Sequence, residues 1–72
     1  MKSNRERIFL TLAAQPRCTI NDLADAVGIS AISVRHHLSS MEAEALVASE
    51  EERHGVGRPR LVYFLTEKGL ER

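Results

Sequence analysis

The sequence predicts a mainly α-helical fold with a small β-hairpin, arranged as a three-helix bundle followed by two strands. Three observations predict this fold. Apolar residues recur at helical spacing over roughly the first 45 residues, capping residues precede each periodic run, and a loop with glycine and proline then separates two strand-like runs. A chain of 72 residues suffices for one domain with one small core. We therefore predict a single domain over residues 1–72.

The first helix is predicted to begin after a cap at Ser3 or Asn4 and to end at about Ala14, before a proline that cannot continue it. Four residues at helical spacing form its expected core stripe: Ile8, Phe9, Leu12 and Ala13. Thr19 is the expected cap of the next helix, with Asp22 completing a capping-box-like pair.

The central stretch, residues 19–47, holds two helical patterns joined by a Gly-Ile-Ser turn. The first pattern is Ile20–Val27 and the second is 31–45. Gly28 suits the left-handed conformation that ends a helix, and Ser30 can cap the next one. The core side of the second pattern is expected to consist of Val34, Leu38, Met41 and Ala45. Two short helices at this spacing are typical of a helix-turn-helix.

Two strands are predicted after the helices, over residues 46–52 and 61–65. They flank a turn-rich loop and form a β-hairpin that must pack on the helices, because so small a hairpin is marginal alone. Strand alternation places two sets of residues on opposite faces of the second strand: Leu61, Tyr63 and Leu65 on one, and Val62 and Phe64 on the other. Three helices followed by a hairpin make a winged helix-turn-helix, with residues 53–60 as the wing.

Composition limits the class of protein. The apolar runs are too short for a membrane span, the N-terminus lacks a signal-peptide pattern, and Cys18 has no second cysteine to pair with, so we predict a cytoplasmic protein. Ten basic and ten acidic residues cancel, which counts against a nucleic-acid binder unless the charges are segregated. We expect the Arg35 side of the second pattern and the hairpin tip to form one continuous positive surface.

The outward face of helix 31–45 carries residue types that contact DNA. Arg35 suits a guanine edge, Ala31 or Ile32 a thymine methyl group, and serines near a helix N-terminus suit phosphate or base. The predicted major-groove set is Ser30, Ala31, Ile32, Ser33, Arg35, His36 and Ser39. The alternative is a solvated helix face whose charges are incidental.

The wing supplies a second predicted contact. Arginines beside a proline suit a narrow minor groove or the phosphates, and the predicted set is His54, Arg58 and Arg60. The alternative is a plain hairpin turn.

Elsewhere, the spacing of the histidines and of Cys18 does not favour a metal site, because zinc sites need three or four converging ligands. We predict no enzyme, no cofactor and no small-molecule site, since the sequence shows neither a catalytic set nor a phosphate-binding glycine loop.

Two segments resemble a known family. Residues 29–38 (ISAISVRHHL) followed by 41–47 (MEAEALV) resemble the recognition helix of ArsR- and MarR-like bacterial winged-helix repressors, and residues 54–69 (HGVGRPRLVYFLTEKG) resemble the wing of SufR-type regulators. In SufR-type regulators a larger C-terminal domain carries the cysteines of an iron–sulfur cluster, so the resemblance implies DNA binding here without cluster sensing. The sequence departs from that pattern at Ala45, where the family often has glycine, and at Phe64.

We therefore expect sequence-specific binding to double-stranded DNA by a bacterial transcription regulator, with repression favoured over activation. The alternative is a protein–protein interaction module, which zero net charge would suit. Homodimerisation stays open. The last residues resemble the start of a further helix, which indicates either a fragment of a longer regulator or a very small protein.

Overall fold

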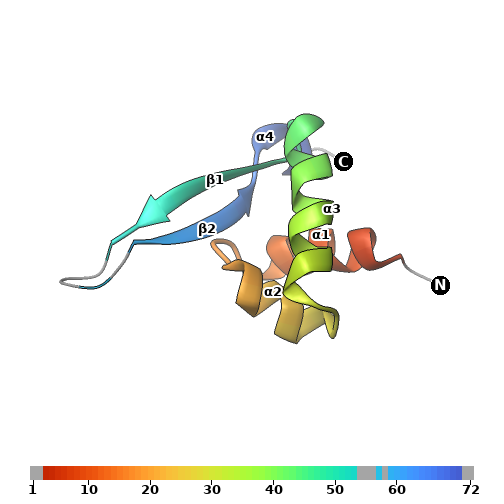
Figure 1. The fold of residues 1–72 in the computed structure, drawn as a ribbon. Coiled ribbons are helices and arrows are strands. Elements are labelled where there is room, and N and C mark those ends of the chain that lie inside the picture. Colours follow the sequence, from red (N-terminus) through yellow and green to blue (C-terminus); the bar gives the residue numbers. More distant parts are fainter. Residues whose placement is uncertain (1–2, 54–56, 58, 71–72) are drawn as a thin grey trace.

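The computed structural model describes residues 3–53, 57 and 59–70 (Figure 1). Its elements are, in order, α1 (Asn4–Ala14), α2 (Ile20–Val27), α3 (Ala31–Ala43), β1 (Val47–Glu52), β2 (Arg60–Leu65) and α4 (Glu67–Leu70). The strands form an antiparallel two-stranded sheet. The predicted fold class, three helices followed by a β-hairpin, is confirmed.

The three main helices begin after the capping residues that the sequence predicts. Ser3 Oγ accepts a hydrogen bond from the amide of Glu6 at 3.1 Å. Thr19 and Asp22 form a reciprocal capping box, each side chain accepting from the other's amide at 3.1 Å. Ser30 caps α3 after Gly28, whose φ of 80° ends α2. The predicted starts of all three helices are therefore confirmed.

One apolar core joins the helices to the root of the hairpin. Its buried members on the helices are Ile8, Leu12, Leu23, Val27, Val34, Leu38 and Met41, and Cys18, Leu46, Val47 and Tyr63 close it from the other segments. Phe9, Ile20 and Ala24 pack partly buried against this core. Ala13 is exposed, which corrects its predicted place in the core stripe. The predicted core positions of Ile8 and Leu12 are confirmed, since both are buried.

α3 ends two residues earlier than predicted, at Ala43 rather than Ala45. Ala45 is exposed and has a left-handed φ of 61°, so its predicted core position is wrong. The physical reason is the turn into β1. The Leu46 amide bonds back to the Met41 carbonyl at 2.9 Å, and the chain then reverses to bury Leu46 and Val47.

Within the hairpin, β2 lies between β1 and the segment that precedes α2. Its register pairs Val47 with Leu65 and Glu52 with Arg60, so β1 begins one residue later and β2 one residue earlier than predicted. On its other edge, β2 forms a bridge in which Cys18 and Tyr63 exchange backbone hydrogen bonds of 3.0 and 2.7 Å. This bridge ties β2 to the segment before α2 and so holds the hairpin against the helical bundle.

The two faces of β2 are not divided simply into buried and exposed. Tyr63 on one face and Val62 on the other are both buried, whereas Leu61, which shares the face of Tyr63, is 42% exposed. Burial along β2 is therefore greatest in the middle of the strand, at Val62 and Tyr63, while Phe64 and Leu65 are half-buried.

Beyond its root the hairpin extends away from the helical bundle, with α3 standing beside it and α1 behind α3 (Figure 1). α4 lies next to the C-terminal end of α3. In the part of the chain that the structure describes, every helix is too short or too polar to cross a membrane.

Candidate nucleic-acid interface

The outward side of α3 is open to solvent. Five of the predicted contact residues are exposed there: Ala31, Ile32, Arg35, His36 and Ser39. Ile32 is the most exposed large hydrophobic residue in the described chain, at 82%. The opposite side of the helix is held in the core by Val34, Leu38 and Met41, so the face that α3 presents is fixed by packing.

Two predicted serines take part in the cap of α3. Ser30 Oγ accepts from the amide of Ser33 at 3.2 Å and donates to Ser33 Oγ at 3.1 Å. Ser33 is half-buried, whereas Ser30 is exposed. The proton of Ser30 is therefore engaged within the cap, while the Ser33 hydroxyl accepts in that bond and keeps its own proton for donation.

Arg35 lies on the part of α3 that borders the hairpin. Burial raises the pKa of the Tyr63 hydroxyl, Glu42 raises it further, and Arg35 opposes both, so the charges of these two α3 residues act on the same strand residue. Glu42 also accepts a hydrogen bond from Ser49 Oγ on β1, at 3.4 Å. Because Arg35 and Glu42 are two turns apart, they share one side of the helix. Arg35 therefore connects the outward face of α3 with the hairpin.

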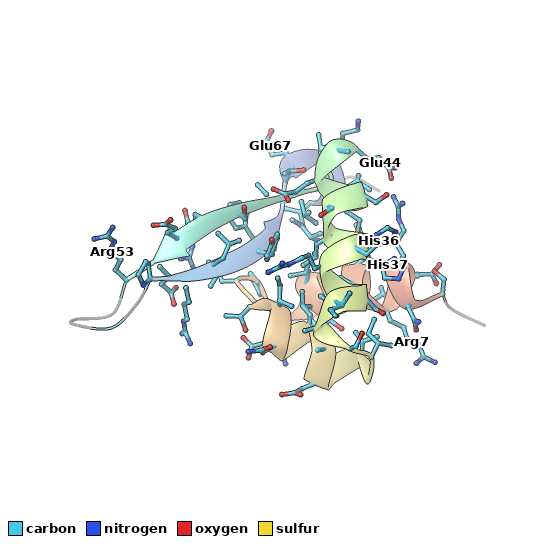
Figure 2. The ribbon with its side chains drawn as sticks, viewed as in Figure 1. Arg7, His36, His37, Glu44, Arg53 and Glu67 are labelled. Carbon is cyan, nitrogen blue, oxygen red and sulfur yellow. The ribbon has the colours of Figure 1, made fainter. Side chains whose placement is uncertain are left out.

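The histidines of α3 lie away from the hairpin. Figure 2 shows His36 and His37 on the side of α3 opposite to the strands, and their rings meet edge to face with centroids 6.3 Å apart. His37 is half-buried and His36 exposed. The two predicted basic contacts of this helix, Arg35 and His36, are thus spread over the width of its outward face.

The root of the wing, where Glu52 of β1 pairs with Arg60 of β2, carries an ion-pair network that sequence reasoning missed. Arg17 pairs with Glu50 and, at 3.0 Å, with Glu52, while Arg60 pairs with Glu52 at 3.1 Å. The hydrogen bonds to Glu50 and Glu52 raise the pKa of Arg17. Arg17 has a left-handed φ of 68°, which is uncommon for a residue with a side chain. No local sequence signal connects it to β1, since the partners are far apart along the chain.

This network corrects the expected surface charge. Arg60 is exposed, but its charge is balanced by Glu52. Glu42, which accepts from Ser49 of β1, adds a negative charge on the same side of α3 as Arg35. The described surface from α3 to the wing is therefore mixed in sign and not uniformly positive. Arg53 projects at the far end of the hairpin (Figure 2). His54 and Arg58, the other predicted wing contacts, lie outside the described residues.

A shallow hollow of about 190 Å³ opens between the N-terminal ends of α2 and α3. Its lining is Ile20 from α2 and Ala31, Ile32 and Arg35 from α3. Ile20 was not among the predicted contacts, because its approach to α3 depends on how the two helices cross. Over residues 3–53, 57 and 59–70, no three His, Cys, Asp or Glu side chains gather closely enough to hold a metal ion.

A helix-turn-helix with an open second helix and a hairpin at its side defines a winged helix-turn-helix domain. Residues 1–46 match the family described as winged helix-turn-helix DNA-binding, and the chain belongs to that family. The predicted resemblance to winged-helix regulators is thereby confirmed. The closer resemblance to SufR-type regulators stays a prediction. A search of curated proteins finds no significant match.

Solved structures of bacterial proteins share this fold. ZitR from Lactococcus lactis in complex with DNA is 27% identical, with a TM-score of 0.78 over 99% of this chain and 47% of that one. The adhesin competence repressor AdcR from Streptococcus pyogenes is 28% identical, with a TM-score of 0.82 over 96% and 49%. A MarR family transcriptional regulator from Silicibacter pomeroyi is 19% identical, with a TM-score of 0.82 over 96% and 44%. The chain thus spans about half the length of these structures.

Proposed function

We propose that this chain binds specific sequences of double-stranded DNA as the reading domain of a bacterial transcription regulator, with repression as its role. α3 enters the major groove, and residues 53–60 of the wing contact the minor groove or the phosphates. The proposed base-reading and phosphate contacts are those predicted from the sequence: Ser30, Ala31, Ile32, Ser33, Arg35, His36 and Ser39 on the helix, and His54, Arg58 and Arg60 on the wing.

The position of Arg35 is the observation that carries this proposal. It stands on the outward face of α3, and its charge acts on the hydroxyl of Tyr63 in β2. A side chain there can reach a base edge while the hairpin lies along the adjacent backbone, which is the docking geometry of a winged helix. The DNA complex of ZitR, 27% identical to this chain, supports a role in DNA binding.

The proposal includes a second copy of the chain. Zero net charge gives one copy weak attraction for phosphates, and two recognition helices held one turn of DNA apart would add their contacts on a palindromic site. Leu10, which is 42% exposed on α1, offers an apolar contact for such a dimer. Sedimentation equilibrium of the free chain and of its DNA complex would establish the number of copies in each.

Selection of binding sites from a random duplex pool, followed by anisotropy titration at several salt concentrations, tests the function. We expect the purified chain to enrich one motif and to lose affinity steeply as salt rises. A protein–protein interaction module would bind neither random nor selected duplex at low salt, and that result would overturn the proposal. Binding without enrichment of any motif would contradict its sequence specificity.

A further inference from the structure

The hollow between α2 and α3 combines two kinds of chemistry. Ile20, Ala31 and Ile32 give it aliphatic walls, and Arg35 gives it one cationic edge. Ile32 is almost fully exposed, whereas Ile20 is half-buried and packs against the core. The hollow therefore has one fixed wall, on α2, and one projecting wall, on α3.

An exposed isoleucine alone needs no explanation, since single surface hydrophobics are common. Here it lines the same hollow as a second isoleucine, Ile20, and as Arg35. In the major groove one base edge offers an apolar group, the C5-methyl of thymine, and the same edge carries the O4 acceptor. The hollow is complementary to this edge, because the aliphatic walls can cover the methyl group while Arg35 donates to O4 or to the neighbouring base.

We propose that Ile20 and Ile32 form a reading site for the C5-methyl group of a thymine, which makes Ile20 on α2 a specificity-determining residue alongside α3. This inference rests on the proposed function and adds Ile20 of α2 to the thymine contact expected of Ile32. Cytosine fits poorly, since it lacks the methyl group and presents an amino donor where Arg35 also donates.

The test replaces each thymine of the selected site in turn with deoxyuridine, which removes only the methyl group. We expect one position in each half-site to lose roughly fourfold in affinity, the effect of uncovering one methyl-sized apolar group. The Ile32→Ala chain should bind thymine and uracil sites equally at that position. Leu70→Ala, which shortens an exposed leucine on α4, should keep the discrimination of the unaltered chain.

A second arm replaces the same thymine–adenine pair with 5-methylcytosine–guanine, which keeps the methyl group but exchanges the acceptor for a donor. We expect weaker binding than with thymine. Equal binding would overturn the assignment to thymine.

A third arm uses Ile20→Val, which shortens the side chain on α2. It should lower the ratio of affinities for the thymine and uracil sites, with circular dichroism confirming the fold. An unchanged ratio would remove Ile20 from the site.

The failures of the two proposals differ. Suppose the chain enriches a motif and its binding depends steeply on salt. If no position is then sensitive to uracil, or if the Ile32→Ala chain is equally sensitive, the methyl site is overturned and DNA binding stands. Absence of binding to every duplex overturns the proposed function and the methyl site with it.

Discussion

Arg60 donates two hydrogen bonds to Oε1 of Glu52, from Nε at 3.3 Å and from Nη2 at 3.1 Å. The other oxygen of the same carboxylate accepts from Arg17 at 3.0 Å. Exposed ion pairs of this kind contribute little to stability. Their larger consequence is electrostatic, because Glu52 offsets the charge of arginines at the root of the wing, where the proposed function places phosphate.

We expect Glu52→Gln to strengthen DNA binding without respect to sequence. Removing the carboxylate releases Arg60 to attract phosphate, while Arg17 keeps its pair with Glu50, so the salt slope should steepen by roughly one. Anisotropy titration against selected and unselected duplexes measures both effects. Glu67→Gln on α4 is the matched control, since it makes the same charge change away from the wing (Figure 2). An equal gain in both variants would mean that net charge alone is responsible.

The helices could be predicted because their signals are local. Periodic apolar residues and capping side chains act within a few residues of each other, and Thr19 with Asp22 forms the predicted capping box. Ala45 shows where local reasoning ends. Its place at helical spacing predicts a core residue, but the turn that brings β1 back onto the bundle gives it a left-handed conformation and exposes it.

The candidate site divides in the same way. The helical period alone predicts which residues face outward on α3, and the structure exposes Ile32, Arg35 and Ser39. The pairing of Arg17 with Glu50 and Glu52, by contrast, joins a loop to a strand more than thirty residues later. Such contacts depend on the packed fold, so no sequence spacing predicts them.

Arg35→Ala tests the assigned reading surface. We expect it to relax base preference at one position and to cost about 1–3 kcal/mol of binding free energy, because a direct contact with a base edge is lost. Arg58→Ala should instead weaken binding to all sequences and flatten the salt slope by about one. Arg7→Ala, an exposed arginine on α1, controls for the loss of charge. If titrations with selected and scrambled duplexes give all three variants the same profile, the surface is wrongly assigned.

Ala45→Gly should stabilise the fold. The left-handed conformation costs an alanine about 1–2 kcal/mol, which glycine avoids, and the greater freedom of glycine in the unfolded chain returns part of that gain. We expect a net increase of about 0.5–1 kcal/mol in the free energy of unfolding, measured by urea denaturation. Ala43→Gly, at the end of α3, should change stability in the opposite direction, and a gain there would contradict this explanation.

Gly69→Ala should destabilise the contact between α4 and the turn after α3. A Cβ at this position would lie 2.3 Å from the carbonyl oxygen of Leu46, a backbone atom that cannot move aside as a side-chain end would. Overpacking of this kind costs about 1–3 kcal/mol. Thermal unfolding followed by circular dichroism measures the loss. Lys68→Ala, an exposed neighbour on α4, should leave the melting temperature almost unchanged.

Stability should fall at alkaline pH through two residues that form one bridge. Burial raises the pKa of the Cys18 thiol, with Asp22 adding to the effect, and burial also raises the pKa of the Tyr63 hydroxyl. Both groups hold their protons more tightly in the folded chain than in the unfolded one. Their contribution is therefore complete below the ordinary pKa of each group and is lost as the pH rises through the raised value, beginning above about pH 8.5 for the thiol.

Urea denaturation at a series of pH values from 7 to about 11 checks this behaviour, since those values bracket the ordinary thiol and phenol pKa. We expect the free energy of unfolding to stay constant and then to decline. Tyr63→Phe should reduce the slope of the later part because it removes one of the two protons.

The same burial should make Cys18, which donates from Sγ to the Gln15 carbonyl at 2.9 Å, slow to react with a thiol reagent in the folded chain and fast in urea. Stability that rises with pH in this range would contradict the direction of both shifts.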